Sequence, residues 1–417
     1  MGDLKAISLY TGAGGLDFGF EAAGCDTVAA VELDHDCCRT ISTNRSWRVL
    51  EGDIGHIESS EILSAAATAP GEIDLLIGGP PCQPFSKSGY WASGDAKRLL
   101  DPRASTIGAL LRVLRETRPR AFLMENVEGL GYRGKSEGLE LIYKVITDIN
   151  ETTGSKYSPC LSVLNAADFG VPQVRRRLFV VASRDGTPFH FPKTTHASAD
   201  DAALNDERPR YLTAWDAIGG LPREINEELR MRGRWADLLP TIPEGCNYLW
   251  HTERMGGLPL FGWRRRYWSF LLKLAKNRPA WTLQAAPGPA IGPFHWTNRR
   301  LSPLEMCRLQ TFPPGIEVAG SYPSVQRQLG NAVPSLLAEV LAREVRKQLF
   351  RLPLTSAEPV LSCHQARAPR PPPEAVLPVP NRFHALIGRH AAHPGTGKGS
   401  GATRRIAAQE VLDFAAQ

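Results

Sequence analysis

The chain has 417 residues, of which 42% are hydrophobic and 22% are charged, so it is long enough for one large and one smaller domain and is not disordered by composition. The formal net charge of +6 is a mild basic excess, which suggests a polyanionic partner without proving one. No apolar run is long enough to span a membrane, no secretion signal opens the chain, and the eight cysteines contain no C-x-x-C pair. We therefore expect a cytoplasmic protein with no metal site and no disulfide framework.

Short apolar segments alternate with helix-like segments between residues 4 and 184. The helix-like patterns include residues 107–116 and 138–149, and the apolar segments are typical of buried strands. Strands are expected at residues 6–10, 27–32, 48–52, 73–78, 121–125, 158–164 and 178–182. This alternation predicts an α/β fold with a Rossmann-like, doubly wound, mostly parallel sheet. The last two strands should form an antiparallel hairpin, because little helical sequence separates them.

The composition changes at about residue 185, where Pro, Arg and Trp become frequent and the periodicity weakens. We therefore divide the chain into a first domain at 1–184, a smaller second domain at 185–319, and a return to the first domain at 320–355. Two further helices are expected at 302–310 and 334–349. Residues 364–417 are rich in Pro, Gly and Arg, which predicts a flexible tail with a short helix at 406–414.

The first strand runs into a glycine-rich turn, YTGAGGL, at residues 10–16. Glycines allow a tight turn and a close approach of a ligand to the backbone. Carboxylates end the next two strands: Glu32 can accept hydrogen bonds from both ribose hydroxyls of an adenosine cofactor, and Asp53 can bind the adenine amino group while Ile54 packs on the ring. The spacing is not G-x-G-x-x-G, which argues against a dinucleotide, and a tight turn without a ligand is the simpler alternative. The three strand ends together favour a nucleoside cofactor.

A cysteine follows the fourth strand in GGPPCQPFS, residues 78–86. Open α/β sheets bind ligands at this edge, and two prolines stiffen the backbone before the cysteine. A thiolate is a nucleophile, but Cys82 needs a charged or dipolar setting because an ordinary thiol is mostly protonated at neutral pH. The polar, glycine-rich residues 86–94 have the composition of a loop that closes over a substrate. A buried cysteine in a turn is the alternative.

Charged residues follow or precede the remaining strands. Glu125 ends the fifth strand, at the same sheet edge as the cysteine, and could donate a proton to a ring nitrogen. QVRRR, residues 173–177, precedes the last strand, and in an extended segment Gln173, Arg175 and Arg177 point to one face. The arginines could hold a base carbonyl or phosphates. Taken singly, Glu125 could equally be a salt-bridge partner and the arginines a solvated surface.

The strings GGPPCQPFS, ENV and QVRRR occur in this order, and the sequence resembles the DNA (cytosine-5) methyltransferase family over nearly all of residues 4–350. YTGAGG is similar to the family's S-adenosylmethionine loop, and EGDI to its adenine-binding strand end. RLSPLEMCRLQTFP (300–313) resembles the segment that supports the target-recognition domain, and QLGNAVP (328–334) resembles the last cofactor motif. Tyr10 stands where phenylalanine is usual, and Trp281 begins a segment in which Pro-Thr is often found. Neither departure affects the catalytic residues.

The resemblance implies a fold and a cofactor. The fold is a class I S-adenosylmethionine-dependent methyltransferase domain with a smaller target-recognition domain, and the cofactor is S-adenosylmethionine, without a metal. The residues that the resemblance assigns to the cofactor are Tyr10, Thr11, Gly12, Ala13, Gly14, Gly15, Leu16, Glu32, Leu33, Asp53, Ile54, Pro81, Asn331 and Val333.

The resemblance also implies a mechanism. Cys82 adds to carbon 6 of cytosine, while Glu125 protonates ring nitrogen 3. Arg175 and Arg177 hold the base carbonyl, carbon 5 takes the methyl group, a base that could be water removes the carbon 5 proton, and the thiol is expelled. The cytosine must leave the duplex stack for this chemistry, so the loop after Cys82 is expected to act as a lid. Its candidate DNA contacts are Gln83, Ser86 and Ser88.

The second domain mixes aromatic and basic residues, above all in WRRRYW, residues 263–268. This composition suits a surface that reads base edges and phosphates, with Arg264, Arg265 and Arg266 as candidate contacts. An aromatic core with a solvated basic rim is the alternative. The implied partner is double-stranded DNA, bound by a monomer at the bacterial nucleoid, with functional pairing to a restriction endonuclease as for bacterial modification methylases.

Two other functions compete with site-specific DNA (cytosine-5) methylation. A tRNA cytosine-5 methyltransferase of the same family would carry a Cys-Phe-Thr tripeptide after the acid motif, and none occurs here. A catalytically inactive DNA-binding protein or repressor would not need Cys82, Glu125 and the cofactor turn.

Overall fold

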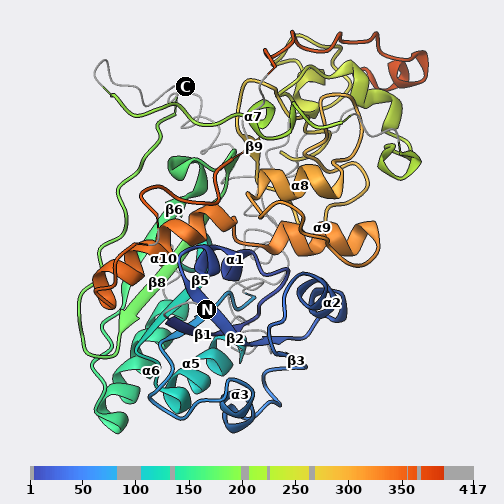
Figure 1. Cartoon of the computed structure of the whole chain (residues 1–417). Helices are drawn as coiled ribbons and strands as arrows, with labels where there is room; N and C mark the ends of the chain where they lie inside the picture. The colour runs from blue at the N-terminus through green and yellow to red at the C-terminus, as the bar shows by residue number, and fades with distance from the viewer. Residues whose placement is uncertain are drawn as a thin grey trace.

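The computed structural model describes residues 4–81, 105–131, 137–198, 206–222, 226–262, 268–354, 356–363 and 368–388. It has a lower lobe built on one large sheet and an upper lobe (Figure 1). The upper lobe contains the helices α7 (Ala214–Ile218), α8 (Pro303–Leu309) and α9 (Tyr322–Asn331). Outside the described residues lie Cys82, Gln83, Ser86, Ser88, Arg264, Arg265 and Arg266, together with the helix expected at 406–414. Their roles stay predictions.

The lower lobe contains a seven-stranded sheet in the order β3-β2-β1-β4-β5-β8-β6. Its strands are β1 (Leu4–Leu9), β2 (Cys25–Glu32), β3 (Val49–Glu51), β4 (Leu75–Gly78), β5 (Ala121–Val127), β6 (Cys160–Asn165) and β8 (Arg176–Ser183). Strands β1 to β5 pair in parallel, whereas β8 pairs antiparallel with both β5 and β6. The structure therefore confirms the doubly wound, mostly parallel sheet and the terminal hairpin.

Helices pack on both faces of the sheet (Figure 1). The helices of the lower lobe are α1 (Gly15–Ala22), α2 (His35–Asn44), α3 (Ser59–Ala65), α5 (Ser105–Thr117), α6 (Glu137–Thr153) and α10 (Ser335–Leu349). Because successive strand residues point to opposite faces, Leu4 and Ala6 join an apolar cluster with α1 and α10. Ile7 and Leu9 join the other cluster, with α3, α5 and α6. Burial on both faces explains why the central strands are almost continuously apolar.

The expected strands, and the expected helices that fall on described residues, are all present, with ends shifted by a few residues. The sequence predicts Tyr10 as the last residue of the first strand, but its φ of 57° turns the chain out of the strand. Two short strands, β7 (Gln173–Val174) and β9 (Ala280–Trp281), form a separate parallel pair that the sequence did not predict. This pair ties the segment before β8 to the upper lobe.

The upper lobe consists mostly of loops and short 3-10 helices. The 3-10 helices of the upper lobe include η6 (Glu227–Leu229), η7 (Ala236–Thr241), η8 (Tyr248–His251) and η10 (Asn381–Leu386). Two others, η4 (Glu128–Gly131) and η5 (Ala166–Phe169), follow β5 and β6 in the lower lobe. Tyr248 and Trp296 are buried, so part of the aromatic content is core, as the alternative reading of this region expected. A third apolar cluster joins α7, α8 and α9 to Phe18 of α1 and so links the two lobes. None of the described helices combines the length and apolar character needed to cross a membrane.

Residues 368–388 correct the prediction of a flexible tail at 364–417. Phe383 is only 3% exposed and its ring stacks on Trp235 with centroids 5.9 Å apart. Leu377 N–H donates to the Pro240 carbonyl over 3.1 Å, and Lys276 Nζ lies 3.1 Å from a Glu374 carboxylate oxygen. Proline fixes φ and so reduces the entropy lost when such a segment becomes ordered. The composition alone therefore overestimated the disorder of this segment, which lies against the upper lobe.

We expect Phe383→Ala to lower the free energy of unfolding by about 3–5 kcal/mol, the usual cost of removing a buried aromatic ring. Ile387→Ala is the matched control, because Ile387 belongs to the same segment but is exposed and should change stability by less than about 0.5 kcal/mol. Urea unfolding of the two variants measures both values. Equal, small effects would show that residues 368–388 do not stabilise the upper lobe.

A fully buried carboxyl group, Asp17, lies in α1 directly after the glycine turn. Asp17 accepts a hydrogen bond of 3.0 Å from the Thr27 hydroxyl, and burial raises its pKa to about 6. The unfolded chain has an ordinary aspartate pKa of about 3.9. The folded state therefore binds the proton more tightly, so this group's stabilising contribution is complete below about pH 4 and is lost as pH rises through about 6.

Asp17→Asn is expected to remove this pH dependence. The free energy of unfolding of the variant, relative to that of the wild type, should increase by about 2–3 kcal/mol between pH 4 and pH 7, from about 1.4 kcal/mol per pKa unit. Urea titrations of both proteins at the two pH values test this. A difference between mutant and wild type that is constant with pH would contradict the assignment of a raised pKa to Asp17.

Candidate active site

The pairing register brings four strand ends to one level. Leu9 of β1 pairs with Val31 of β2 and with Gly78 of β4. Gly78 also pairs with Met124 of β5. The next residues of the four strands therefore lie together at the carboxyl edge of the sheet: Tyr10, Glu32, Gly79 and Glu125. Open α/β sheets bind ligands at this edge, so the structure collects the predicted cofactor turn, its carboxylate, the start of the cysteine loop and the predicted acid.

The glycine turn is shaped by the backbone at two positions. Gly12 has a φ of 58°, and its N–H donates to Glu32 Oε2 over 2.7 Å. A Cβ atom on Gly12 would meet no other group within 4 Å, so the space beside it is open to a ligand. A Cβ atom on Gly15 would lie 2.4 Å from the Val333 carbonyl oxygen, so only glycine permits this close packing.

The other predicted residues of the turn serve different purposes. Thr11, Ala13 and Leu16 are buried, and the Thr11 hydroxyl donates to the Ser8 hydroxyl over 3.0 Å. They fix the shape of the turn, while the backbone of the turn borders the open space. Gly14 is also left-handed, with a φ of 81°.

Glu32 is held by three backbone N–H groups. Its Oε1 accepts from Leu33 and Asp34, each over 2.8 Å, and its Oε2 accepts from Gly12. Burial raises the pKa of Glu32, and these three hydrogen bonds act in the opposite direction. A carboxylate has about four acceptor positions, so free capacity remains chiefly on Oε2. The carboxylate is thus oriented by the backbone of the two residues that follow it and by the backbone of the glycine turn.

The two predicted apolar contacts of the cofactor differ in accessibility. Ile54 is buried within the apolar cluster of the lower lobe, and its packing on a cofactor ring stays a prediction. Leu33 is 66% exposed directly after Glu32, so it presents the apolar surface at this position. Asp53 accepts a hydrogen bond of 2.8 Å from Gly55 N–H through Oδ1. Asn331 is exposed at the end of α9.

Glu125 forms a shielded ion pair with Arg177. Arg177 Nε lies 2.9 Å from Glu125 Oε1, and the two side chains are only 17% and 10% exposed. Burial raises the pKa of Glu125, while Arg177 and Arg175 lower it. A Cβ atom on Gly79 would lie 3.2 Å from Glu125 Oε2. The carboxyl group therefore faces the chain three residues before Cys82, and burial raises its pKa.

Arg175 does not present its guanidinium to the same space. It is fully buried, and its terminal nitrogens donate to the carbonyls of Gly330 over 2.8 Å and Leu283 over 3.4 Å. Burial lowers its pKa well below the usual value, and the nearby Arg177 adds to this effect. Of the two predicted arginines, Arg177 is placed beside Glu125, and Arg175 joins the strand to the upper lobe.

Two residues that the sequence analysis missed anchor the start of the cysteine loop. Asn126 Nδ2 donates to the Pro80 carbonyl over 3.1 Å, and the Thr106 hydroxyl donates to the Pro81 carbonyl over 3.0 Å. The carbonyl of Thr106 in turn accepts from the Tyr10 hydroxyl over 2.7 Å. The asparagine of the ENV string was a signal for the first contact, whereas no local pattern indicates Thr106. Together they connect the cofactor turn with the residue that precedes Cys82.

A cavity of about 420 Å³ lies between α9 and the loop that follows β9. Because β9 pairs with β7, this loop begins beside the strand that directly precedes Arg175. The polar residues that line the cavity include Gln284, Arg300, Tyr322, Gln326 and Arg327. Arginine and amide groups at such a position suit phosphates and base edges. Within the described ranges, no cluster of three metal-binding side chains occurs.

Two solved methyltransferase structures share this fold. The Entamoeba histolytica methyltransferase EhMeth superposes with a TM-score of 0.56 and 16% identity, over 84% of this chain and 99% of that one. The S. pombe Dnmt2 methyltransferase gives a TM-score of 0.52 and 19% identity, over 83% of this chain and 99% of that one. At these identities the likeness establishes the fold alone.

Sequence comparison identifies the family. The C-5 cytosine-specific DNA methylase family model matches residues 4–347, so the chain belongs to this family. Type II methyltransferase M.SacI of Streptomyces achromogenes is 41% identical over 372 residues, which cover 83% of this chain and 94% of that protein. Type II methyltransferase M.NgoFVII of Neisseria gonorrhoeae is 34% identical over 350 residues, or 82% of this chain and 86% of that protein.

Proposed function

We propose that this chain binds S-adenosylmethionine at the carboxyl edge of the sheet and methylates carbon 5 of a cytosine within a short duplex DNA sequence. One observation carries the proposal: strand pairing aligns the carboxyl ends of β2, β4 and β5. Glu32, the chain leading into Cys82 and the shielded Glu125–Arg177 pair therefore lie at one edge of the sheet. This arrangement supports a cofactor carboxylate and a proton donor at one edge of the sheet, next to the chain that leads into the proposed nucleophile.

The residues present fit the cofactor. Gly12 leaves open space beside the turn, Glu32 keeps acceptor capacity for the ribose hydroxyls, and Leu33 offers an exposed apolar surface for the adenine. Asp53 ends the adjacent strand and is suited to the adenine amino group, and the cofactor, when bound, supplies an electrophilic methyl group on sulfur. Further residues proposed to border it are Tyr10, Pro81, Asn331 and Val333.

Three residues are each assigned one role in the reaction. The Cys82 thiolate forms a bond to carbon 6 of the cytosine, and the electron pair of the 5,6 double bond makes carbon 5 nucleophilic. Glu125 gives a proton to ring nitrogen 3, and Arg177 binds the base carbonyl and stabilises the developing charge. Carbon 5 takes the methyl group, and ring nitrogen 3 returns its proton to Glu125. Carbon 5 then loses its own proton to a base, and the carbon 6–sulfur bond breaks to release the thiolate.

Arg175 is assigned a positioning role. Its hydrogen bonds to Gly330 and Leu283 fix the strand that carries Arg177, and its positive charge lowers the pKa of Glu125 from the value that burial alone would give. This replaces the expected direct contact between Arg175 and the base.

Duplex DNA is the proposed substrate, with the target cytosine turned out of the stack because neither face of carbon 5 is accessible inside a helix. Gln83, Ser86, Ser88 and the arginines at 264–266, all outside the described residues, are proposed DNA contacts. Among the described residues, Gln284 and Arg300, which line the cavity beside α9, are further proposed DNA contacts. By analogy with its type II relatives, we propose that the modification protects DNA from a partner endonuclease.

Transfer of a labelled methyl group tests this proposal. The full chain is incubated with methyl-labelled S-adenosylmethionine and either plasmid DNA or bulk tRNA, and the nucleosides are separated. Label in 5-methyldeoxycytidine from the plasmid is the expected result. Label only in tRNA would replace the DNA substrate by RNA, and DNA binding without transfer to either substrate would make the chain a DNA-binding protein.

A further inference from the structure

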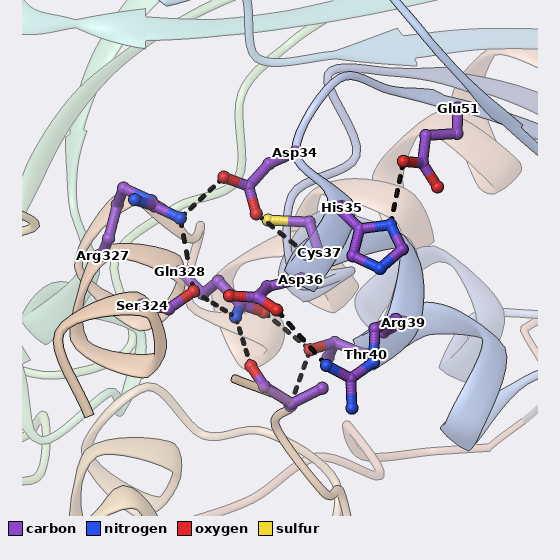
Figure 2. A network of polar contacts seen from close by, with 11 residues as sticks. Asp34, His35, Asp36, Cys37, Arg39, Thr40, Glu51, Ser324, Arg327 and Gln328 are labelled. Atoms are coloured by element: carbon purple, nitrogen blue, oxygen red, sulfur yellow. Dashed lines mark hydrogen bonds and ion pairs between the residues drawn. The ribbon is translucent and has the colours of Figure 1, made fainter. Parts of the chain in front are cut away.

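A polar network joins α2 of the lower lobe to the segment before α9 and to α9 itself (Figure 2). Asp36, Thr40 and Asn44 follow one another at four-residue spacing and so share one face of α2. Asn44 exchanges two hydrogen bonds with the backbone of Glu317, of 2.7 and 3.0 Å. Ala319 N–H donates to the Thr40 hydroxyl over 2.9 Å. This face of α2 therefore holds the chain that leads into α9.

Gln328 closes the network from the side of α9 (Figure 2). Its Oε1 accepts from the Thr40 hydroxyl over 2.7 Å, and its Nε2 donates to the Ala319 carbonyl over 2.7 Å. Thr40 and Gln328 are buried, so these bonds are shielded from water. Loss of either partner would leave a buried polar group unsatisfied, which fixes α9 against α2.

Arg327, one residue earlier on α9, reaches the cofactor side of α2 (Figure 2). Its guanidinium lies 2.7 Å from Asp34 Oδ2. Asp34 Oδ1 caps α2 by accepting from Cys37 N–H over 3.1 Å. The Asp34 N–H is one of the three groups that orient Glu32. A continuous chain of hydrogen bonds thus runs from Arg327 through Asp34 to the proposed ribose-binding carboxylate.

The other end of α9 touches the opposite side of the same site. The chain leaves α9 at Asn331, and the Val333 carbonyl packs against Gly15 at the end of the cofactor turn. α9 and the residues just after it therefore contact both sides of the proposed site: the strand end that carries Glu32 and the glycine turn that faces it.

We propose that Arg327 is a positioning residue for the cofactor, which acts through Asp34 to hold Glu32 in its binding orientation. The inference rests on the proposed function, because it takes Glu32 as a cofactor ligand. The Arg327 and Asp34 side chains are 47% and 32% exposed, and an exposed ion pair adds little to stability. Removal of the pair should therefore weaken cofactor binding without a comparable loss of stability.

Calorimetric titration of the full chain with S-adenosylmethionine, in the absence of DNA, tests the inference. Arg327→Gln is expected to raise the dissociation constant about fivefold or more, within the usual range of coupling between sites. Asp34→Asn should raise it to a similar extent, and the double variant should be no worse than the more affected single variant, since both break one chain of contacts. Arg327→Lys keeps the charge and should recover part of the affinity.

Arg39→Gln is the matched control. Arg39 lies on α2, and among the ion pairs of the described chain it pairs only with Asp36, at 3.6 Å. The substitution therefore removes a positive charge from the same network without changing a contact of Asp34. The dissociation constant of Arg39→Gln for S-adenosylmethionine should match that of the wild type. The urea midpoints of Arg39→Gln and of the Arg327 and Asp34 variants should also match the wild-type midpoint.

Glu32→Ala separates this inference from the proposal on which it rests. If Glu32→Ala abolishes binding but Arg327→Gln leaves it unchanged, the positioning role is wrong while the cofactor site stands. If Arg327→Gln weakens only DNA binding, Arg327 belongs to the DNA surface beside the cavity and the inference is overturned. If Glu32→Ala has no effect, the cofactor site itself is wrong, and the inference falls with it.

Discussion

Replacing Cys82 by alanine is expected to abolish methyl transfer while leaving the affinity for duplex DNA close to that of the wild type. Without the thiolate, no bond forms at carbon 6, and carbon 5 of cytosine is too weak a nucleophile to accept the methyl group. Cys82 lies outside the described residues, but the chain that delivers it is held by Asn126 and Thr106. The measurement is incorporation of labelled methyl groups into plasmid DNA, beside a gel-shift assay of binding.

Cys160→Ala is the control for this experiment, because Cys160 is another thiol of the lower lobe, on β6 and away from the strand-end site. It should retain full activity. DNA that carries 5-fluorocytosine provides a second readout, because fluorine at carbon 5 blocks the final loss of a proton and leaves the carbon 6–sulfur bond intact. With the wild type, mass spectrometry should find this DNA adduct on the peptide that contains Cys82. Methyl transfer by Cys82→Ala would contradict the account.

Glu125→Gln is expected to lower the turnover number by about 10²–10⁴, the usual contribution of a general acid. Glutamine keeps the shape and can hydrogen-bond, but it cannot transfer a proton to ring nitrogen 3. The sign of the pH effect follows from burial, which raises the pKa of Glu125. As pH rises through that raised pKa, the wild type loses its proton donor and its rate should fall, whereas the variant should lack this limb of the profile.

Glu128→Gln is the comparison for the carboxylate variant. Glu128 pairs with Arg176 at 3.1 Å, from the same two segments of chain, but Arg176 is well exposed, so this pair should matter little. Steady-state rates of both variants between pH 5 and pH 9 distinguish them. Equal losses would mean that Glu125 acts through the packing of β5 and β8 rather than as an acid.

The strand-end residues could be predicted from sequence because their signals are local. An apolar run that ends in Glu32 or Glu125 indicates both a strand and the residue at its carboxyl end, and parallel pairing then brings these ends together. The glycine turn and the proline pair before Cys82 are likewise visible in a few consecutive residues. These local signals predict the sheet, its doubly wound class and the strand-end residues Glu32 and Glu125.

Features that depend on contacts between distant segments could not be predicted. Arg175 alternates with Arg177 in the sequence, as two base contacts on one strand face would, yet its guanidinium donates to the carbonyls of Gly330 and Leu283. Thr106 has no motif around it, and its role arises only when α5 meets the end of β4. The order in residues 368–388 depends on an aromatic surface in the upper lobe that composition does not reveal.

The most direct test of the central claim is a methylation map of plasmid DNA. The full chain and Cys82→Ala are each incubated with plasmid and S-adenosylmethionine, and the DNA is sequenced after bisulfite treatment, which spares 5-methylcytosine. The account predicts that one cytosine resists conversion at every copy of a single short sequence with the wild type, and at none with Cys82→Ala. Complete conversion of DNA that the wild-type protein demonstrably binds would contradict it.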